Sequence, residues 1–296
     1  MITIPADFAA GIQAREGEAG LAWLAALPTI VADLCQRWTL VVEGESWHGH
    51  LAIVVPVRRK AEPCALKVSW QDTETVHEAL ALKVWNGRGT VRLLESSPDH
   101  GAMLLERLDA QRTLFDLPLD LAIPIAGEIV RNLSVPGDAS LPTVAGLAAE
   151  IVRTVPERWE RLGRPVPLRL IDQAVELATA LSSPSANTMV NWDLHYGNVL
   201  FSPARQAWVA IDPKPATGAP ESGIAQLFWT RIADVAGPAD FHRHLDALIE
   251  SAGLDAELTR DWIRVRVVDF WLWELSVGLA HDPGGCATIL DWLGYR

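Results

Sequence analysis

The sequence contains few cysteines, and this scarcity excludes two common kinds of scaffold. Only three of its 296 residues are Cys, and Cys35, Cys64 and Cys286 lie far apart along the chain. An odd number of widely spaced cysteines supports neither a disulfide framework nor a CxxC metal site. We therefore expect these thiols to lie in the core of a protein that resides in a reducing cytoplasm.

Basic residues are scarce as well. The chain carries 25 Lys and Arg against 37 Asp and Glu, for a net charge of −12, and its largest basic cluster is "RRK" at residues 58–60. A nucleic-acid partner is not expected, because binding to a phosphate backbone needs a concentrated positive surface. A cationic small molecule would complement such a chain much better.

The sequence also lacks a long hydrophobic run without charges. Its first twenty residues have neither the basic start nor the apolar centre of a secretory signal. The most membrane-like stretch, residues 262–280, contains Arg264, Arg266, Asp269 and Glu274, each of which would cost about 2.5 to 3.5 kcal/mol near the middle of a bilayer. We predict a buried helix there and expect no membrane association.

The residues that are present point to two lobes of different composition. At 296 residues the chain is near the length at which a single hydrophobic core stops growing. A helix is predicted at residues 26–38, and a second one, beginning at Asp72, at residues 72–85. A small antiparallel sheet is predicted from the β-rich runs around them, at residues 38–57, 64–70, 90–96 and 102–108.

From about residue 120 the apolar spacing becomes mostly helical. It predicts helices at residues 123–133, 144–162, 168–182, 224–235, 240–252 and 257–280. We therefore predict an α+β fold with two lobes. Residues 1–108 form an N-terminal lobe with the antiparallel sheet, residues 109–296 form a mainly helical C-terminal lobe, and the protein is expected to be a monomer.

One stretch in the helical half reads instead as strand, tight loop and strand. "VNWDLHYGNVL" at residues 190–200 can pair with "QAWVAIDP" at 206–213, and a turn near Arg205 would place Asn198 directly opposite Asp212. Taken alone, the stretch fits a polar turn equally well. If the two runs do pair, Asp193, Asn198 and Asp212 converge on one point, where their oxygens suit a hard cation such as Mg²⁺.

This order and spacing of residues is typical of a kinase catalytic loop, in which an Asp is followed five positions later by an Asn and then by a metal-binding Asp. Phosphoryl transfer needs cations that neutralise the phosphates and a carboxylate that accepts the hydroxyl proton. The pattern predicts Asp193 as the base, with Asn198 and Asp212 as ligands of Mg²⁺. We expect His195 to be a hydrogen-bonded structural residue rather than a metal ligand.

Five blocks of the sequence together resemble the aminoglycoside and hydroxyurea antibiotic-resistance kinases, the streptomycin 6-phosphotransferase group. They are "ALKVSW", "HEALALKVWNGRGTVRLLE", "MLLERLD", "DLHYGNVL" and "WVAIDPKP". The resemblance runs in order from about residue 38 to about residue 235. It implies a bilobal protein-kinase-like fold with ATP in the cleft, so that residues 1–108 bind the nucleotide and residues 109–296 carry the catalytic loop, the metal site and the acceptor-binding helices.

The resemblance also assigns roles to single residues. Lys67 looks like the lysine that pairs with the α and β phosphates, and Glu78 looks like its ion-pair partner. "LLERLD" looks like the inter-lobe hinge, with backbone groups of Glu106 and Leu108 facing adenine. A snorkelling lysine and a solvated helix glutamate are the alternatives for Lys67 and Glu78.

The sequence departs from the family pattern in two places. The family usually has His-Gly before the catalytic Asp, where this chain has Asn191 and Trp192. An amide at residue 191 can brace the loop by hydrogen bonding in place of the imidazole, but the change leaves a weakened or inactive kinase as an alternative. The presumed phosphate loop at residues 41–55 has only Gly44 and Gly49, so phosphate cover there would rely on Ser46 and backbone amides.

The leading functional prediction is an ATP-dependent O-phosphotransferase that acts on a hydroxyl of a small polar molecule. A streptomycin-like aminoglycoside is the expected acceptor, with antibiotic resistance as the result. Alternatives are a kinase of hydroxyurea or of an amino sugar, and a nucleotide-binding pseudokinase. A protein kinase is disfavoured because no A-P-E segment follows Asp212. The acidic residues expected to attract a cationic acceptor are Glu221, Asp234, Asp240, Asp269, Glu274 and Asp282.

Overall fold

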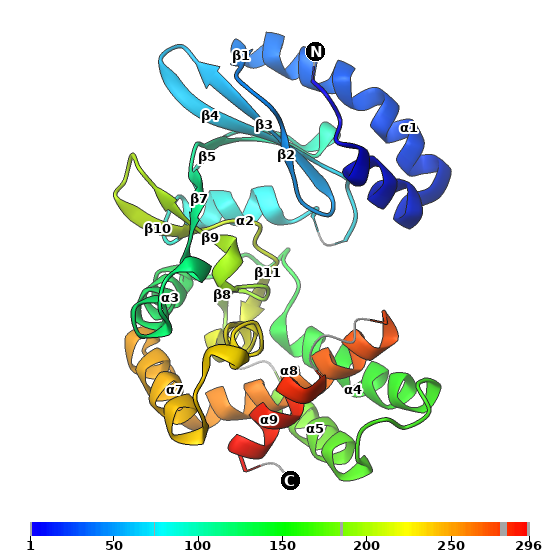
Figure 1. The fold of residues 1–296 in the computed structure, drawn as a ribbon, viewed down its shortest axis with the longest axis vertical. Helices are drawn as coiled ribbons and strands as arrows, with labels where there is room; N and C mark the ends of the chain where they lie inside the picture. The colour runs from blue at the N-terminus through cyan, green and yellow to red at the C-terminus, as the bar shows by residue number, and fades with distance from the viewer. Residues whose placement is uncertain (1, 74, 184–185, 279–282, 295–296) are drawn as a thin grey trace. The chain divides into compact units, whose positions relative to one another are not determined.

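The computed structural model describes residues 2–73, 75–183, 186–278 and 283–294. The chain forms two compact units. The first comprises Met1–Asp109 together with the short segment Ser202–Arg205, and the second comprises Ala110–Phe201 and Gln206–Arg296. Each unit has its own arrangement of secondary structure (Figure 1).

The first unit is built on an antiparallel sheet with the strand order β1-β3-β4-β6-β5, and a short strand β2 pairs with β3. The strands are β1 (Leu40–Val42), β2 (Trp47–His48), β3 (Ala52–Arg59), β4 (Glu62–Ser69), β5 (Leu93–Ser97) and β6 (Ala102–Glu106). The sheet predicted for this part of the chain is therefore confirmed. It places Lys67 on a central strand and Glu106 at the end of the neighbouring strand.

Helix α1 (Ala6–Trp38) is much longer than the helix predicted at residues 26–38. Its path bends at Gly17, whose φ of 60° lies in the left-handed region, where glycine avoids the Cβ clash that other residues meet. Among the described helices, α1 is the one long and apolar enough to cross a membrane by length and composition. In the structure its apolar residues, among them Phe8, Ile12 and Leu27, share one core with Val55 and Leu66 of the sheet.

The helix predicted at residues 72–85 begins later, as α2 (Glu78–Trp85). Asp72 does not cap it. The Asp72 side chain accepts a hydrogen bond from the backbone N–H of Thr75 at 3.1 Å, and the Thr75 hydroxyl donates to the carbonyl of Trp70 at 2.7 Å. These local bonds stabilise a turn in place of the first helical turn, and they leave Glu78 as the first residue of the helix.

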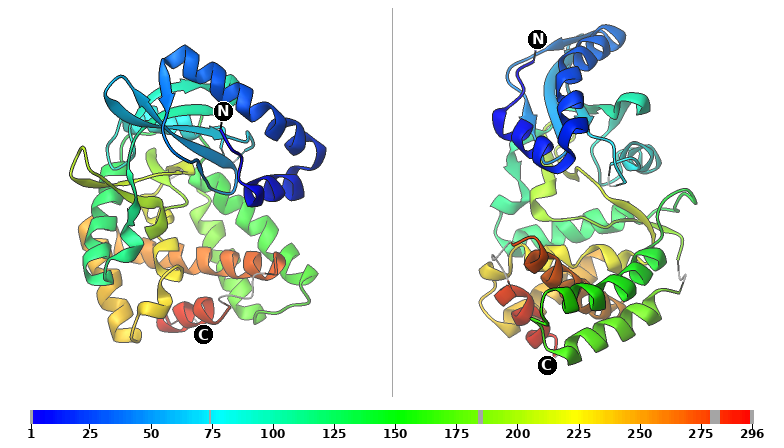
Figure 2. Two further views of the ribbon diagram at one scale, coloured as in Figure 1. Left: turned by 45° about the horizontal axis from the view of Figure 1, so that its top comes forward. Right: turned by 90° about the vertical axis from the view of Figure 1, so that its right-hand side faces the viewer.

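The second unit is mainly helical. Its helices are α3 (Leu119–Leu133), α4 (Val144–Arg161), α5 (Leu168–Leu181), α6 (Gln226–Trp229), α7 (Pro238–Ala252), α8 (Ala256–Ser276) and α9 (Pro283–Trp292). Helix α3 packs against α7, α4 against α5, and α5 against α8 (Figures 1 and 2). Most of the predicted helices are therefore confirmed, although residues 279–280 of the predicted 257–280 helix lie outside the described residues.

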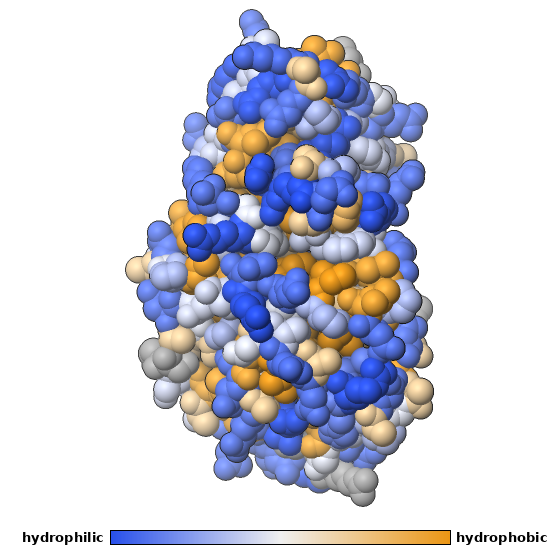
Figure 3. Space-filling view, turned by 90° about the vertical axis from the view of Figure 1, so that its left-hand side faces the viewer, coloured by the Kyte–Doolittle hydropathy of each residue, from blue (hydrophilic) through white to orange (hydrophobic). Residues whose placement is uncertain are grey.

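Two small sheets flank residues 190–200, which contain the predicted catalytic loop. Strand β8 (Thr188–Asn191) pairs with β11 (Pro215–Gly218), and a second sheet has the order β10 (Ala207–Ala210), β9 (Val199–Ser202) and β7 (Asp109–Thr113). The sequence predicted the hairpin of β9 and β10, and extended structure at residues 109–113, but not the pairing of β7 with β9 and not β11. The face drawn in Figure 3 is largely hydrophilic, with smaller hydrophobic areas between the polar side chains.

One helix prediction in the second unit is wrong. Residues 224–235 do not form a continuous helix. They form α6 and a 3₁₀ turn at Ile232–Asp234. The break falls at Arg231, whose guanidinium donates to the carbonyl of Leu117 at 2.7 Å and to the carboxylate of Asp234 at 2.6 Å. Tertiary contacts of this arginine thus override a local apolar pattern that favours a helix.

Candidate active site

The predicted catalytic loop begins where β8 ends, and its first residue braces it. Asn191 is buried, and its side-chain Oδ1 accepts hydrogen bonds from the backbone N–H groups of Asp193 and Lys214, each at 3.1 Å. This single amide oxygen therefore links the two chain segments that carry the charged residues of the loop. The amide does hold the loop by hydrogen bonding, in the position where the family pattern has His.

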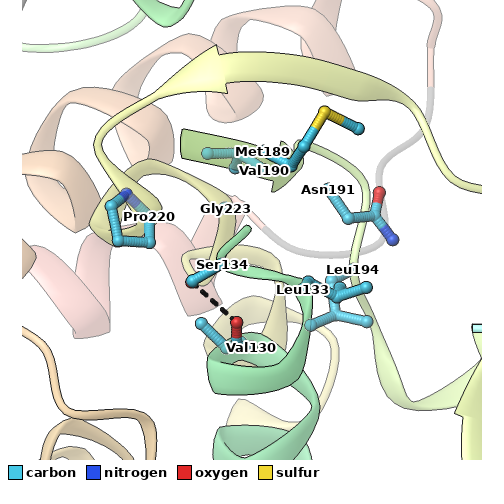
Figure 4. A pocket seen from close by; sticks show the side chains of 9 residues that line it. All are labelled: Val130, Leu133, Ser134, Met189, Val190, Asn191, Leu194, Pro220 and Gly223. Carbon is cyan, nitrogen blue, oxygen red and sulfur yellow. Dashed lines mark hydrogen bonds between the residues drawn. The ribbon is translucent and has the colours of Figure 1, made fainter. Parts of the chain in front are cut away.

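Asn191 also borders a small apolar cavity, with Leu133, Met189 and Leu194 among the lining residues (Figure 4). Its Nδ2 has no hydrogen-bond partner among the described residues. A buried amide nitrogen without a partner is costly, so the two bonds accepted by Oδ1 are made at some expense in stability. Such an expense is common at functional sites.

Asp193 lies beside a positive charge. Its Oδ2 is 3.4 Å from the Nζ of Lys214, and the two side chains are 25% and 44% exposed. A pair this exposed contributes little to folding stability. Because Lys214 lies next to the candidate base Asp193, it is instead a candidate for a role in the reaction.

His195 is a half-buried side chain of the loop, and two carboxylates affect its pKa. Burial lowers the pKa of His195, while the nearby carboxylates of Asp193 and Asp212 oppose this shift. Both carboxylates therefore act electrostatically on the imidazole. Gly197 leaves room for this ring, since a Cβ at residue 197 would lie 3.2 Å from the His195 Cε1.

The predicted register of the hairpin is off by one residue. The carbonyl of Asn198 accepts a hydrogen bond from the N–H of Ile211 at 2.8 Å, so residue 211 rather than Asp212 pairs with Asn198. Residues Tyr196–Asn198 form a 3₁₀ turn, and Asp212 has a φ of 47°. A left-handed turn, which Asp tolerates better than most residues, thus places Asp212 just beyond the hairpin.

The predicted Mg²⁺ site offers few protein ligands. The described residues contain no group of three or more His, Cys, Asp or Glu that could hold a metal ion alone. Asn198 lies just before β9 and Asp212 two residues after β10, so an amide and a carboxylate oxygen are available at the same end of the hairpin. Mg²⁺ usually takes one or two protein carboxylates and completes its shell with water and substrate phosphates. The pair therefore fits a cation that is shared with a nucleotide.

The first unit contains a buried ion pair that joins Lys67 to Glu78. The Nζ of Lys67 lies 2.7 Å from both carboxylate oxygens of Glu78, and the two side chains are only 6% and 4% exposed. Lys67 does not snorkel and Glu78 is not a solvated helix charge. Burial of such a pair is weak evidence for stability, because desolvation offsets much of the attraction. A pair of this kind next to a predicted nucleotide site is a functional candidate.

The predicted hinge residue Glu106 has a structural role that the sequence analysis missed. Its carboxylate accepts hydrogen bonds from the Arg205 guanidinium at 2.8 Å, the Ser202 hydroxyl at 3.1 Å and the Arg92 N–H at 2.9 Å. Its own N–H donates to the Arg92 carbonyl at 3.0 Å. These bonds attach segment Ser202–Arg205 to the first unit. Leu108 follows β6 at the end of this unit, and the adenine-facing role of both backbones stays a prediction.

The described acidic residues that were expected to attract a cationic acceptor interact with other residues of the second unit. Asp269 pairs with Arg158 at 2.9 Å, and Asp234 pairs with Arg231 at 2.6 Å. Glu221 accepts a hydrogen bond from the N–H of Asp255 at 3.1 Å. Asp240 pairs with Arg243, Glu274 is buried, and Asp282 lies outside the described residues. Each of the five described carboxylates thus has a partner within the second unit, since Glu274 is contacted by the Cys286 thiol at 4.0 Å.

The fold is that of the protein-kinase-like small-molecule kinases. The structure is similar to a crystal structure of the aminoglycoside phosphotransferase APH(4)-Ia, with a TM-score of 0.58 and 14% identity over 90% of this chain and 99% of that one. It is also similar to choline kinase LicA from Streptococcus pneumoniae, with a TM-score of 0.57 and 11% identity over 91% of this chain and 99% of that one. The predicted fold class is confirmed.

The chain belongs to the aminoglycoside/hydroxyurea antibiotic resistance kinase family, whose model matches residues 37–278. It is 36% identical to the streptomycin 6-kinase of Streptomyces glaucescens, over 99% of this chain and 97% of that protein. It is 37% identical to the hydroxyurea phosphotransferase of Kitasatospora aureofaciens, over 96% and 83% of the two chains. The predicted family is confirmed, and the protein is a small-molecule kinase.

Proposed function

We propose that this kinase transfers the γ-phosphoryl group of ATP to a hydroxyl of a streptomycin-like aminoglycoside, with Mg²⁺ as cofactor. The observation that carries the proposal is the braced loop, in which Asn191 fixes the segments of Asp193 and Lys214 through one side-chain oxygen. Support for the nucleotide comes from a related structure, in which APH(4)-Ia is in complex with ADP and hygromycin B. A monomer in the cytoplasm, where ATP is available, accords with this function.

Each residue of the site has a defined role in this mechanism. Asp193 accepts the proton of the acceptor hydroxyl as its oxygen attacks the γ-phosphorus, and ADP leaves with the electrons of the broken P–O bond. Lys67, held by Glu78 at 2.7 Å, pairs with the α and β phosphates. Asn198 and Asp212 would hold the cation, which would supply neutralisation of phosphate charge. The backbones of Glu106 and Leu108 bind adenine.

The pseudokinase alternative rested on Asn191 and Trp192, and the geometry argues against it. A loop that had lost its function would not need a buried amide that accepts two backbone hydrogen bonds while its nitrogen lacks a partner among the described residues.

The identity of the acceptor is supported less specifically than the reaction. A streptomycin 6-kinase from Streptomyces griseus is 35% identical, and the hydroxyurea phosphotransferase is equally similar.

A panel assay tests both the reaction and the acceptor. ADP release from Mg·ATP is measured with streptomycin, hydroxyurea and neutral amino sugars. We expect turnover with streptomycin, a new phosphate ester on it by mass spectrometry, and much weaker turnover with the others. If hydroxyurea alone is phosphorylated, the aminoglycoside proposal is wrong and the kinase assignment stands.

Asp193→Asn tests the catalytic base. We expect turnover to fall by about 10² to 10⁴-fold, the usual contribution of a positioned general base, with ATP affinity nearly unchanged. Asp172→Asn is the matched control, because Asp172 is exposed on α5. Near wild-type turnover in Asp193→Asn would show that another group accepts the proton.

A further inference from the structure

Arg266 of helix α8 is buried against Trp192 of the predicted catalytic loop. It is 7% exposed, and its guanidinium carbon lies 3.9 Å from the centre of the Trp192 ring and 5.6 Å from that of Trp229. Its Nη2 donates a hydrogen bond to the carbonyl oxygen of Trp192 at 3.2 Å. One side chain thus contacts both the ring and the backbone of the residue that precedes Asp193.

This arginine is expensive to bury. Its Nη1 has no hydrogen-bond partner among the described residues, and burial lowers the pKa of Arg266 to about 10, although Asp269 and Asp193 oppose the shift. Asp269, one turn further along α8, is held by Arg158. A buried cation without full hydrogen bonding costs stability, and a leucine at this position of an apolar helix would avoid that cost.

The contacts of Arg266 combine with those of Asn191 on a single peptide group. The peptide between Trp192 and Asp193 has its C=O bound by Arg266 at 3.2 Å and its N–H bound by Asn191 at 3.1 Å. A peptide group is planar, so hydrogen bonds at both ends fix the orientation of its plane. That orientation constrains the direction in which the Asp193 side chain leaves the backbone, because it fixes the plane to which its N–Cα bond belongs.

We propose that Arg266 is a positioning residue that sets the direction of the Asp193 carboxylate by clamping the Trp192 ring and carbonyl. The inference rests on the proposed role of Asp193 as the base. Arginine suits this task because its planar guanidinium can stack on an aromatic face while it donates in its own plane, which an ammonium group cannot do. The second ring is itself fixed, since Trp229 stacks on Phe270 at 4.2 Å.

The clamp also gives a reason for Trp192. Glycine, which the family pattern has at this position, offers no ring to a buried guanidinium. Trp192 packs edge-to-face against Trp262 at 5.7 Å in addition to its contact with Arg266. Trp192 and Arg266 therefore depend on each other: the ring packs against the guanidinium, and the guanidinium is covered by the ring.

The test measures kcat and the KM for ATP in Arg266→Met and Arg266→Lys, with streptomycin as acceptor, or hydroxyurea if the panel selects it. For Arg266→Met we expect kcat to fall by roughly 10- to 100-fold, as for a misplaced catalytic group, with the KM for ATP changed less than about twofold. Arg266→Lys should fall in between, because a lysine can still donate but cannot stack. Arg264→Met is the matched control in the same helix, since Arg264 donates to Asp261 and to the carbonyl of Leu293.

A double-mutant cycle with Asp193→Asn separates positioning from a structural role. If Arg266 acts through Asp193, Arg266→Met should cause little further loss once Asp193 is Asn. Losses that multiply, or an unchanged kcat in folded Arg266→Lys, would overturn the proposal. If Arg266→Met does not fold, the same cycle with Arg266→Lys decides. A large effect of Asp193→Asn with no effect at Arg266 refutes the positioning role alone, whereas no effect of Asp193→Asn refutes the proposed base.

Discussion

Asp212 illustrates how a single backbone angle determines what a mutation can test. Its φ of 47° is tolerated by Asp and Asn but is unfavourable for Ala. Alanine at residue 212 would combine the loss of a ligand with backbone strain. Asparagine retains the left-handed turn and removes only the charge, so it is the sharper substitution.

We expect Asp212→Asn to weaken Mg²⁺-dependent ATP binding by at least about 10-fold, because changes around a bound metal typically cost that much affinity. Calorimetry with ATP in the presence of Mg²⁺ and in the presence of EDTA measures the effect. ATP binding in EDTA should be the same in both proteins. Equal Mg²⁺ dependence in the two would remove Asp212 from the proposed metal site.

At the residue scale, the sequence predicted which loop residues form the site, and their roles stay a prediction. The order and spacing of Asp193, Asn198 and Asp212 are the basis of that prediction. The pairing of Asn198 with Ile211 was not predicted, because alternation of side chains does not reveal a 3₁₀ turn or a positive φ. The clamp by Arg266 was missed too. Its one signal was an arginine inside an apolar helix, which we took only as evidence against a membrane span.

At the scale of elements, two arginine–glutamate pairs of the first unit have nearly the same length but different burial. Arg205 lies 2.8 Å from Glu106, with side chains 17% and 9% exposed, and Arg59 lies 2.9 Å from Glu95, with side chains 26% and 45% exposed. Arg205 also donates to the carbonyls of Gly87 and Thr90 at 2.6 and 2.9 Å. The buried pair joins the segment of residues 202–205 to the sheet. The exposed pair lies on the surface of the sheet.

We therefore expect Arg205→Met to lower the free energy of unfolding by roughly 3 kcal/mol, since it leaves the Glu106 carboxylate poorly paired and largely buried. The matched substitution Arg59→Met should cost less than about 1 kcal/mol, as exposed pairs do. Urea denaturation with an unchanged slope measures both. Equal effects of the two substitutions would contradict the view that burial of the pair decides its contribution.

Elements were predictable where the apolar period was long and undisturbed. Helices α4, α5, α7 and α8 agree with the predicted ranges to within a few residues at their ends. The part of α1 before residue 26 was missed, and within it a glycine with positive φ interrupts the pattern at residue 17. Residues 224–235 were mispredicted because the contacts of Arg231 with distant parts of the unit cannot be read from local spacing.

At the scale of the whole molecule, the net charge of −12 would attract a cationic acceptor from a distance, without direct contacts between carboxylates and the acceptor. The described acidic residues that we expected near the acceptor form ion pairs and hydrogen bonds within the second unit. What remains is the long-range field of the excess negative charge. Such a field raises the local concentration of a cationic ligand without contacting it, and salt screens it.

We therefore expect the KM for streptomycin to rise a few-fold between low ionic strength and about 0.15 M NaCl, where the Debye length has shrunk to about 8 Å. The measurement is KM against NaCl at saturating Mg·ATP. Neutral hydroxyurea or a neutral sugar serves as the control for salt effects on the nucleotide. A flat profile for streptomycin would show that the negative charge mainly maintains solubility. A steep profile, well beyond that of a long-range field, would instead require carboxylates in direct contact with the acceptor, other than the five whose partners the structure identifies.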